Sequence, residues 1–494
     1  MKAGPVVCLG AFPAPARRML ERLSVVLGRT PAWVVGGALR NALLGEPVGE
    51  LDVAVPAGAV SLGRALAGDL AASGFVVLDA QRRVCRVVSD IQIDIADLRG
   101  PTLADDLRAR DFTVNALAAS IADLVARGSA SLEDATGGLA DLRTRVIKLC
   151  GPRTLLDDPL RALRAVRFAV RPGWSLHASA EPAIRAMAPQ VAAIARERVR
   201  DELVGILAEP AGGAGLRLLD RLSVLAVLLP ESIAMRETSQ PEPHRFDVWE
   251  HSLRAVDAAD ELAARLDGLE PWGAGLTLHL AEPLGDRLTR REMLKLAALL
   301  HDVAKPETKS LEDGRTRFIG HDVRGAERAA AIARRWRLSR HATDVLARLV
   351  GQHLRPMHLA NAGEITRRAR HRFFRDLGDE SRDLLLLSLV DAAAVRGDSP
   401  LAVWARPSGA VVRELMRGMA EEARAAEAPP LVRGEDVMAA FGLEPGPEVG
   451  RLLARAREAQ ALGLVRTRLE ALEYLRRERR ERGPLDTGES APLQ

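Results

Sequence analysis

The pattern of the chain changes at Asp157, and this change limits the folds that the chain can adopt. Before Asp157, short apolar segments with the two-residue period of strands alternate with segments at helical spacing. The expected strands are 32–35, 51–55, 75–78, 84–88 and 91–95. After Asp157, Leu, Ala and charged residues recur almost entirely at helical spacing. We therefore predict a multidomain protein: an N-terminal α/β (α+β) head with a small mixed sheet, followed by an all-α neck, body and tail.

Clusters of Pro and Gly interrupt the helical pattern and mark the expected domain boundaries. They divide the chain into a head, a neck, a body and a basic helical tail, at 1–155, 156–235, 236–425 and 426–494. The last residues, from Gly483, are expected to be disordered.

Three local expectations complete this prediction. Residues 112–118 are expected to be helical, and 146–149 to close the sheet as a last strand. The Gly- and Pro-containing stretch 268–287 is expected to be a loop or an insertion.

Composition bounds the class of protein. With 494 residues, 47% of them hydrophobic, the chain can form two to four domains with their own cores. A net charge of +4 permits a nucleic-acid partner without requiring one. Cys8, Cys85 and Cys150 lie too far apart for a CxxC pair, so we expect buried free thiols in a reducing cytosol. We find neither a signal-peptide pattern nor a membrane span, and we expect a soluble, cytoplasmic protein without a membrane partner. No protein partner is implied.

A Gly-Gly turn at Gly36 and Gly37 separates an expected strand from an expected helix. Glycine lets backbone N–H groups approach an anion, and a helix N-terminus adds its positive dipole end. Arg40, one turn into the helix, could reach a phosphate oxygen. These residues are candidates for binding a triphosphate, although a Gly-Gly turn before a helix is more often simple turn chemistry.

Glu50 and Asp52 follow on the next strand, where their spacing places both carboxylates on one face. Such a pair can lie at a solvated edge without any function. It can also hold two Mg²⁺ ions, because hard cations take carboxylate oxygens and bridge to substrate phosphates. The glycine turn that precedes the pair favours the second interpretation.

Two further clusters carry polar groups. Asp111 and Asn115 are four residues apart, and a carboxylate and an amide can bind sugar hydroxyls or simply cap a helix. Asp158, Arg161 and Arg164 follow at a spacing of three residues. This is either a solvated charged stripe or a group that recognises the Watson–Crick edge of a base.

Together these segments resemble the nucleotidyltransferase superfamily, in its bacterial CCA-adding and poly(A) polymerase branch. The motifs are GGALRNALLGEPVGELDVAV, Arg110-Asp111 with Asn115, and Asp157-Asp158 with Arg161. The chain departs from the family pattern at three positions, with Asn41 for Asp, Glu50 for Asp and Ala109 for Arg. The resemblance implies Mg²⁺ at Glu50 and Asp52, the catalytic residues, and ribose selection by Arg110, Asp111 and Asn115. It implies base pairing of Asp158 and Arg161, aided by Arg164, with incoming CTP or ATP. Asp94 is a weaker candidate for a third acid.

The helical body carries a different set of polar residues, in which an adjacent His-Asp pair interrupts a Leu- and Ala-rich helix. The full set is His251, His301, Asp302, His321, His353 and Asp391. Imidazole and carboxylate ligands suit Mn²⁺, Ni²⁺, Fe²⁺ or Zn²⁺. The order of these residues resembles the HD phosphohydrolase superfamily, which implies a metal site able to act on phosphoesters. Lys305 lies close enough in sequence to contact a phosphate.

The leading hypothesis is a template-independent enzyme that adds CMP and AMP from CTP and ATP to the 3′ end of tRNA and releases pyrophosphate. One alternative is a partial activity, the addition of CC only or A only, or poly(A) synthesis. An alternative of another class is a metal-dependent HD phosphohydrolase whose head binds RNA. The HD set also leaves open an enzyme with both activities.

Overall fold

The computed structural model describes residues 5–482, apart from the side chains of Ala423, Ala425 and Ala426. The described chain forms two compact units. The first comprises residues up to Ile233 with Arg335–Arg337, and the second comprises Ala234–Arg334 and the chain from Leu338. The finer division at 155/156 and 425/426 stays a prediction.

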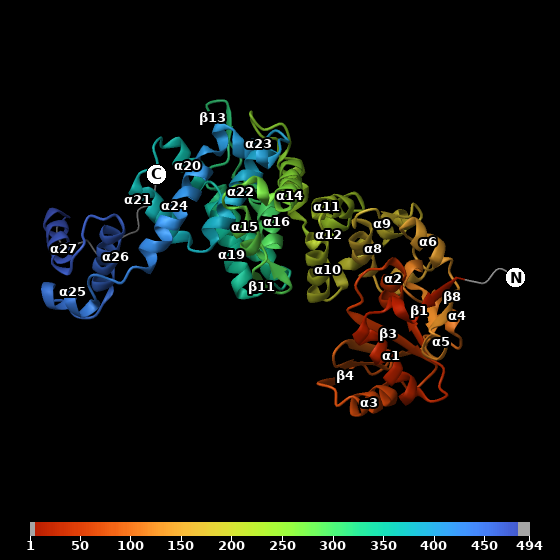
Figure 1. Ribbon diagram of the computed structural model, residues 1–494. Coiled ribbons are helices and arrows are strands. Elements are labelled where there is room, and N and C mark those ends of the chain that lie inside the picture. Colours follow the sequence, from red (N-terminus) through yellow and green to blue (C-terminus); the bar gives the residue numbers. More distant parts are fainter. Residues whose placement is uncertain (1–4, 483–494) are drawn as a thin grey trace. The chain divides into compact units, whose positions relative to one another are not determined.

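The first unit is built on an eight-stranded sheet of order β1-β8-β7-β2-β3-β6-β5-β4 (Figure 1). Its strands are β1 (Val6–Cys8), β2 (Trp33–Val35), β3 (Glu50–Val55), β4 (Gly74–Asp79), β5 (Val84–Val88), β6 (Gln92–Asp97), β7 (Leu117–Ser120) and β8 (Ser129–Asp134). Strands β3 and β6 run parallel and their other neighbours antiparallel, so the predicted mixed sheet is confirmed.

The central strand β3 separates the core from the polar face of the sheet. Leu51, Val53 and Val55 are buried on one side, as the alternation of a strand requires. Glu50 and Asp52 lie on the other side, and Asp52 is opposite Asp94 of the parallel strand β6. The helices α1 (Ala14–Leu27), α2 (Gly36–Leu44), α3 (Ala59–Asp69) and α5 (Ile121–Arg127) pack around this sheet.

Two local predictions in this unit are wrong. Residues 112–118 form a short 3₁₀ turn, η2 (Thr113–Asn115), and the start of strand β7. The apolar run there is a fully buried strand, which periodicity cannot distinguish from a buried helix. The segment 146–149 does not close the main sheet, because β9 (Val146–Ile147) pairs with β10 (Ser175–Leu176).

Helices complete the first unit. They are α4 (Leu103–Arg108), α6 (Gly138–Thr144), α7 (Thr154–Asp157), α8 (Arg161–Ala169), α9 (Ala180–Met187), α10 (Arg196–Ala208), α11 (Gly212–Arg221), α12 (Val224–Leu228) and α13 (Glu231–Arg236), whose last residues belong to the second unit. Helix α8 packs against α10 and α11. The free thiols are not all buried as expected, because Cys8 is exposed on the edge strand β1.

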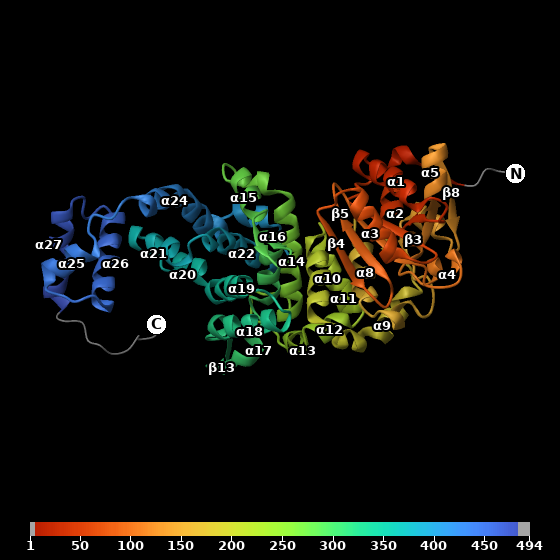
Figure 2. The same ribbon diagram turned by 90° about the horizontal axis from the view of Figure 1, so that it is seen from below.

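The second unit is helical. Its longer helices include α14 (Val248–Ala264), α16 (Arg290–Leu300), α18 (His321–Arg335), α19 (Arg340–Gln352), α22 (Glu380–Ala394) and α24 (Ala410–Glu427). Helices α14, α16 and α22 pack against one another and lie side by side in both views (Figure 2). Helix α22 is central because Leu384–Leu387 are all buried, so it is apolar on every side.

The stretch 268–287 is not simply a loop, because it contains the helix α15 (Gly273–Leu280). At the other end of the unit, α25 (Gly434–Phe441), α26 (Pro447–Ala461) and α27 (Arg468–Arg482) share a small apolar core. Ion pairs from Arg455, Arg468 and Arg479 join these helices, so part of the basic charge of the tail stabilises its own fold. The expected disorder from Gly483 lies outside the described residues.

We predict that Gly138→Ala destabilises the head by about 1–3 kcal/mol. A Cβ atom at Gly138 would overlap the backbone carbonyl of Thr113, at the start of η2. The measurement is the urea or thermal unfolding midpoint. Gly68→Ala in α3 is the matched control, because nothing lies within 4 Å of a Cβ atom there. Equal midpoints for the two variants would contradict this packing.

Candidate functional site

Asp52 and the glycine turn are in direct contact in the first unit. Gly36 has a φ of +70° and starts α2 directly after β2. A Cβ atom at Gly36 would lie 2.6 Å from Oδ2 of Asp52, so only glycine fits this approach. The backbone N–H of Gly37 donates to the same oxygen at 3.3 Å. The turn therefore positions the carboxylate of Asp52.

Three carboxylates gather on this face of the sheet. Glu50 is exposed and accepts from the amide of Gln92, while Asp94 is held by two 2.8 Å bonds from Arg86. Burial, aided by Glu50 and Asp94 and opposed by Arg110, raises the pKa of Asp52 to about 6. A site that resists negative charge in this way suits a bound cation.

Two of the three predicted sugar-binding residues, Asp111 and Asn115, are hydrogen-bonded to each other, whereas Arg110 pairs with Asp106 at 2.9 Å. The amide of Asn115 donates to Asp111 at 3.0 Å, and Arg164 donates to the other oxygen of Asp111 at 3.0 and 3.2 Å. Burial alone would raise the pKa of Asp111, but Arg164 and the hydrogen bond from Asn115 outweigh burial and hold it below its usual value. Asp111 is therefore a carboxylate that accepts hydrogen bonds.

Arg40 is placed differently from the expectation that it contacts a triphosphate. Its guanidinium is buried and donates to Oδ1 of Asn115 at 2.6 Å and to Asn41. It also lies over the ring of Phe168, 4.8 Å from the ring centre. In this structure Arg40 orients Asn115, and its contact with a phosphate stays a prediction.

The predicted base-recognising residues lie at the start of α8. Asp158 accepts from the backbone of Leu160 at 3.1 Å and pairs with Arg198 at 2.7 Å. Arg161 is buried and donates to the backbone carbonyls of Thr154 and Ala109. Arg198 belongs to α10, and Glu202 of the same helix pairs with Arg164. Helix α10 thus holds the predicted base-recognising groups in place.

One hollow of about 280 Å³ brings most of these predicted groups together, but Glu50 and Arg40 do not line it. Its lining includes the predicted residues Gly36, Gly37, Asp52, Arg110, Asp111, Asn115, Asp158, Arg161 and Arg164. Arg198 also lines it, as do Arg82 and Arg99, which the motif analysis missed. No short motif marks Arg82 and Arg99, because they come from a hairpin tip and a strand end.

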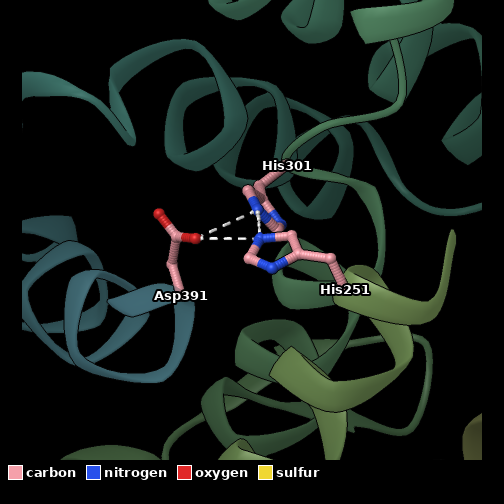
Figure 3. Close-up of side chains that lie close together, drawn as sticks. All are labelled: His251, His301 and Asp391. Carbon is pink, nitrogen blue, oxygen red and sulfur yellow. Dashed lines mark hydrogen bonds and ion pairs between the residues drawn. The ribbon is translucent and has the colours of Figure 1, made fainter. Parts of the chain in front are cut away.

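The second candidate site lies in the second unit, where three side chains from three helices converge (Figure 3). Nε2 of His251 lies 3.0 Å from Asp391 and 3.1 Å from Nε2 of His301. Nε2 of His321 and of His353 lie 3.4 and 3.7 Å from Oδ1 of Asp302. Oδ2 of Asp302 lies 3.2 Å from His301. The structure therefore assembles all six predicted ligands.

The ring orientations in this cluster fit metal ligation. Nδ1 of His301, His321 and His353 each donates to the carbonyl three residues earlier in the chain, at 2.9, 2.6 and 2.7 Å. This bond leaves the Nε2 lone pair directed inwards, as metal ligands require. Burial alone would lower the pKa of His301, but Asp302 and Asp391 outweigh it and raise the pKa to about 10. The cluster therefore strongly favours a cation at its centre.

The six ligands divide into two groups, His251 with His301 and Asp391, and Asp302 with His321 and His353. Lys305 lies beside them, 2.7 Å from Asp302 and 2.7 Å from the amide oxygen of Gln240. Sequence analysis missed Gln240, and it also missed His244, whose ring packs against His251. Both come from the stretch between α13 and α14.

Comparison with known proteins decides the family. Residues 32–148 match a poly A polymerase head domain, 173–235 a probable RNA and SrmB-binding site of polymerase A, and 248–393 an HD domain. An A-adding tRNA nucleotidyltransferase of Deinococcus radiodurans is 37% identical over 90% of this chain and 95% of that protein. The chain belongs to the tRNA nucleotidyltransferase family. A CC-adding tRNA nucleotidyltransferase of Thermus thermophilus is 35% identical over 90% of this chain and 93% of that protein.

Solved structures of this family share the fold. A CCA-adding enzyme of Thermotoga maritima complexed with tRNA aligns over 97% of this chain and 100% of its own, with a TM-score of 0.61 at 19% identity. A CCA-adding enzyme with ATP aligns over 98% of this chain and 100% of its own, with a TM-score of 0.64 at 19% identity. The predicted family, enzyme class and fold class are confirmed. No helix in the described part of the tRNA nucleotidyltransferase is long and apolar enough to cross a membrane.

We predict that Asp52→Asn raises the thermal unfolding midpoint of the metal-free protein above pH 6. The carboxyl of Asp52, with its pKa raised to about 6, loses its proton there, whereas in the unfolded chain it does so near pH 4. Stability therefore falls as the pH rises from 4 to 6, and the amide removes this loss.

Two controls accompany this experiment. Mg²⁺ should raise the midpoint of the unmutated protein more than that of Asp52→Asn, because it neutralises the carboxylate. Asp90→Asn, at an exposed carboxylate paired with Arg18, should change neither result. A midpoint for Asp52→Asn that shows the same pH dependence as the unmutated protein would refute the assignment.

Proposed function

We propose that this protein transfers nucleoside monophosphates from CTP or ATP to the 3′ end of tRNA and releases pyrophosphate. The observation that carries this proposal is the single hollow in the head. It gathers a carboxylate, a glycine turn, a sugar-binding pair and the base-recognising residues. Relatives named for CC or A addition to tRNA, similar over nine-tenths of the chain, support the same reaction.

Glu50 and Asp52 would hold Mg²⁺ in this mechanism, with Asp94 behind them. Bound Mg²⁺ supplies Lewis-acid stabilisation of the phosphate oxygens during displacement. Glu50 is one methylene longer than the usual Asp, and its exposed position with Gln92 as a partner leaves room for the longer side chain. The N–H of Gly37 keeps Asp52 aimed at the hollow.

The sugar-binding pair is oriented before any nucleotide arrives. Arg40 occupies Oδ1 of Asn115, and Asp111 accepts one of its amide hydrogens. One N–H of Asn115 remains for a ribose hydroxyl, whereas Asp111 already accepts from Phe112, Asn115 and Arg164 and would have to share one of these sites with the sugar. Such preorganisation lowers the entropic cost of binding and favours ribonucleotides over deoxyribonucleotides.

The base-recognising residues are Asp158 and Arg161, with Arg164 beside them. An acceptor and a donor group on one helix end can pair with the edge of a cytosine or an adenine. Arg198 pairs with Asp158 from α10 and would have to share or yield this contact when a base binds. Protein side chains would then select the incoming nucleotide in place of a nucleic-acid template.

A partial reaction is the favoured form of this activity over the complete CCA sequence that we first hypothesised. Relatives at 30–37% identity are named A-adding or CC-adding. The multifunctional CCA proteins are less similar, at 28 and 29%. We therefore propose that this chain adds either CC or the terminal A.

We also propose that the HD domain holds a transition metal and hydrolyses phosphoesters. The support is the set of six inward-facing ligands, with Lys305 beside them as a cation for a phosphate oxygen. The alternative of a phosphohydrolase with a merely RNA-binding head is disfavoured, because most of the predicted polar groups of the head line one hollow. We propose a cytoplasmic location for this tRNA-processing activity.

We predict labelled nucleotide incorporation into tRNA lacking its 3′ end, with at least a 10³-fold loss in Asp52→Ala, on the order expected for removing a charge-stabilising group. Three substrates distinguish the forms: tRNA ending at the base before CCA, tRNA ending in CC, and complete tRNA. Incorporation of CTP into the first substrate and into no other indicates CC addition. Incorporation of ATP into the second substrate and into no other indicates A addition.

The outcomes of this assay are clear-cut. Incorporation of CTP followed by ATP into the first substrate would instead support the complete CCA-adding activity. Unlimited addition of ATP would indicate poly(A) synthesis. No incorporation with any substrate would refute the transferase proposal. Asp90→Asn, the exposed head variant used above, controls for nonspecific loss.

We predict that the protein reconstituted with Mn²⁺ retains metal after gel filtration and that His301→Ala retains much less, measured by elemental analysis. His301 contacts both carboxylates of the cluster, so its loss removes a central ligand. The control is His358→Ala, at an exposed position of the same unit. Phosphate release from 2′,3′-cyclic nucleotides should disappear with the metal. Equal metal content in the two variants would exclude this site.

A further inference from the structure

A second hollow of about 640 Å³ adjoins the nucleotide hollow in the first unit. The two share Arg82, Arg99 and Arg161 as lining residues. The second hollow is otherwise lined by Pro56, Gln81, Arg83, Asp97, Leu98, Ala109 and Asp157. None of these is a predicted sugar- or base-recognising residue. The second hollow therefore has a separate lining and a common border with the first.

The lining of the second hollow carries more positive than negative charge. Four arginines face two aspartates, and Arg83 already pairs with Asp97 at 3.1 Å. Burial and the neighbouring Arg110 lower the pKa of Arg99, and Arg161 lowers it too, against the partial compensation of Asp106. Positively charged groups that repel one another in this way are stabilised when an anion binds between them.

The backbone at Ala109 shows how these cations are held. Arg99 donates to the carbonyl of Ala109 at 3.0 Å, and Arg161 donates to the same carbonyl at 3.3 Å. Ala109, which stands where the family that the chain resembles has Arg, also lines the second hollow. Arg99 and Arg161 thus place two positive charges on the backbone carbonyl of this position.

The transfer reaction brings two polyanions together, a nucleoside triphosphate and the end of an RNA strand. The first hollow has the groups that recognise a nucleotide, and the second has mainly cations. We propose that the second hollow binds the backbone phosphates of the last nucleotides of the tRNA acceptor strand, through Arg82, Arg83 and Arg99. This inference rests on the transferase function proposed above. The shared border would bring the strand end next to the bound nucleotide.

The test is Arg83→Glu, because Arg83 lines only the second hollow and is largely exposed. Without nucleotide present, we expect the Kd for tRNA to rise about tenfold and the slope of log Kd against log salt to change by about one. The KM for tRNA should rise likewise, while the KM for CTP or ATP stays within about twofold. The matched control is Arg127→Glu, since Arg127 is an exposed head arginine paired with Asp123 outside both hollows.

A second variant guards against misfolding. Gln81→Glu adds a negative charge to the second hollow and leaves the Arg83–Asp97 pair intact, so it should also weaken tRNA binding. Unchanged tRNA binding in both variants would overturn the proposal. A raised KM for the nucleotide alone would assign the hollow to the triphosphate instead. Failure of the transferase function itself is distinguishable, since the unmutated protein would then incorporate no nucleotide.

Discussion

Arg164 is the residue on which the geometry of the head site depends. Its guanidinium bonds Asp111 with two hydrogen bonds and also reaches Glu202 of α10. One side chain thus connects the proposed sugar-binding pair, the helix that carries the proposed base-recognising residues and the helix that braces it. Because the bonds are charge-assisted and largely removed from water, they are stronger than an exposed ion pair would be. The nucleotide hollow is shaped by this connection rather than by any single motif.

The HD site follows a different principle. Five of its six proposed ligands are buried and Asp391 is partly exposed, and the six come from helices far apart in sequence, so the site exists only when α14, α16 and α22 are packed together. The apolar surfaces of these helices supply the packing free energy, and the polar cluster is formed at their junction. The head site, by contrast, is assembled at strand and helix ends on the open face of a sheet.

Much of both sites could be predicted because their chemistry is local in sequence. The spacing of Glu50 and Asp52 placed them on one face of a strand, and the His301-Asp302 pair indicated a metal site. Tertiary contacts could not be predicted in the same way. The burial of Arg40 on Asn115 depends on how α2 meets η2, and Arg82 and Arg99 reach the hollow only through the sheet topology. The turn at 113–115 was missed because a buried apolar run has no distinguishing period.

Three histidines of the HD site are oriented by main-chain carbonyls rather than by side chains. Substitutions elsewhere cannot delete these acceptors, since every residue type has a carbonyl group. The orientation of the rings is therefore robust to mutation as long as the helix ends persist.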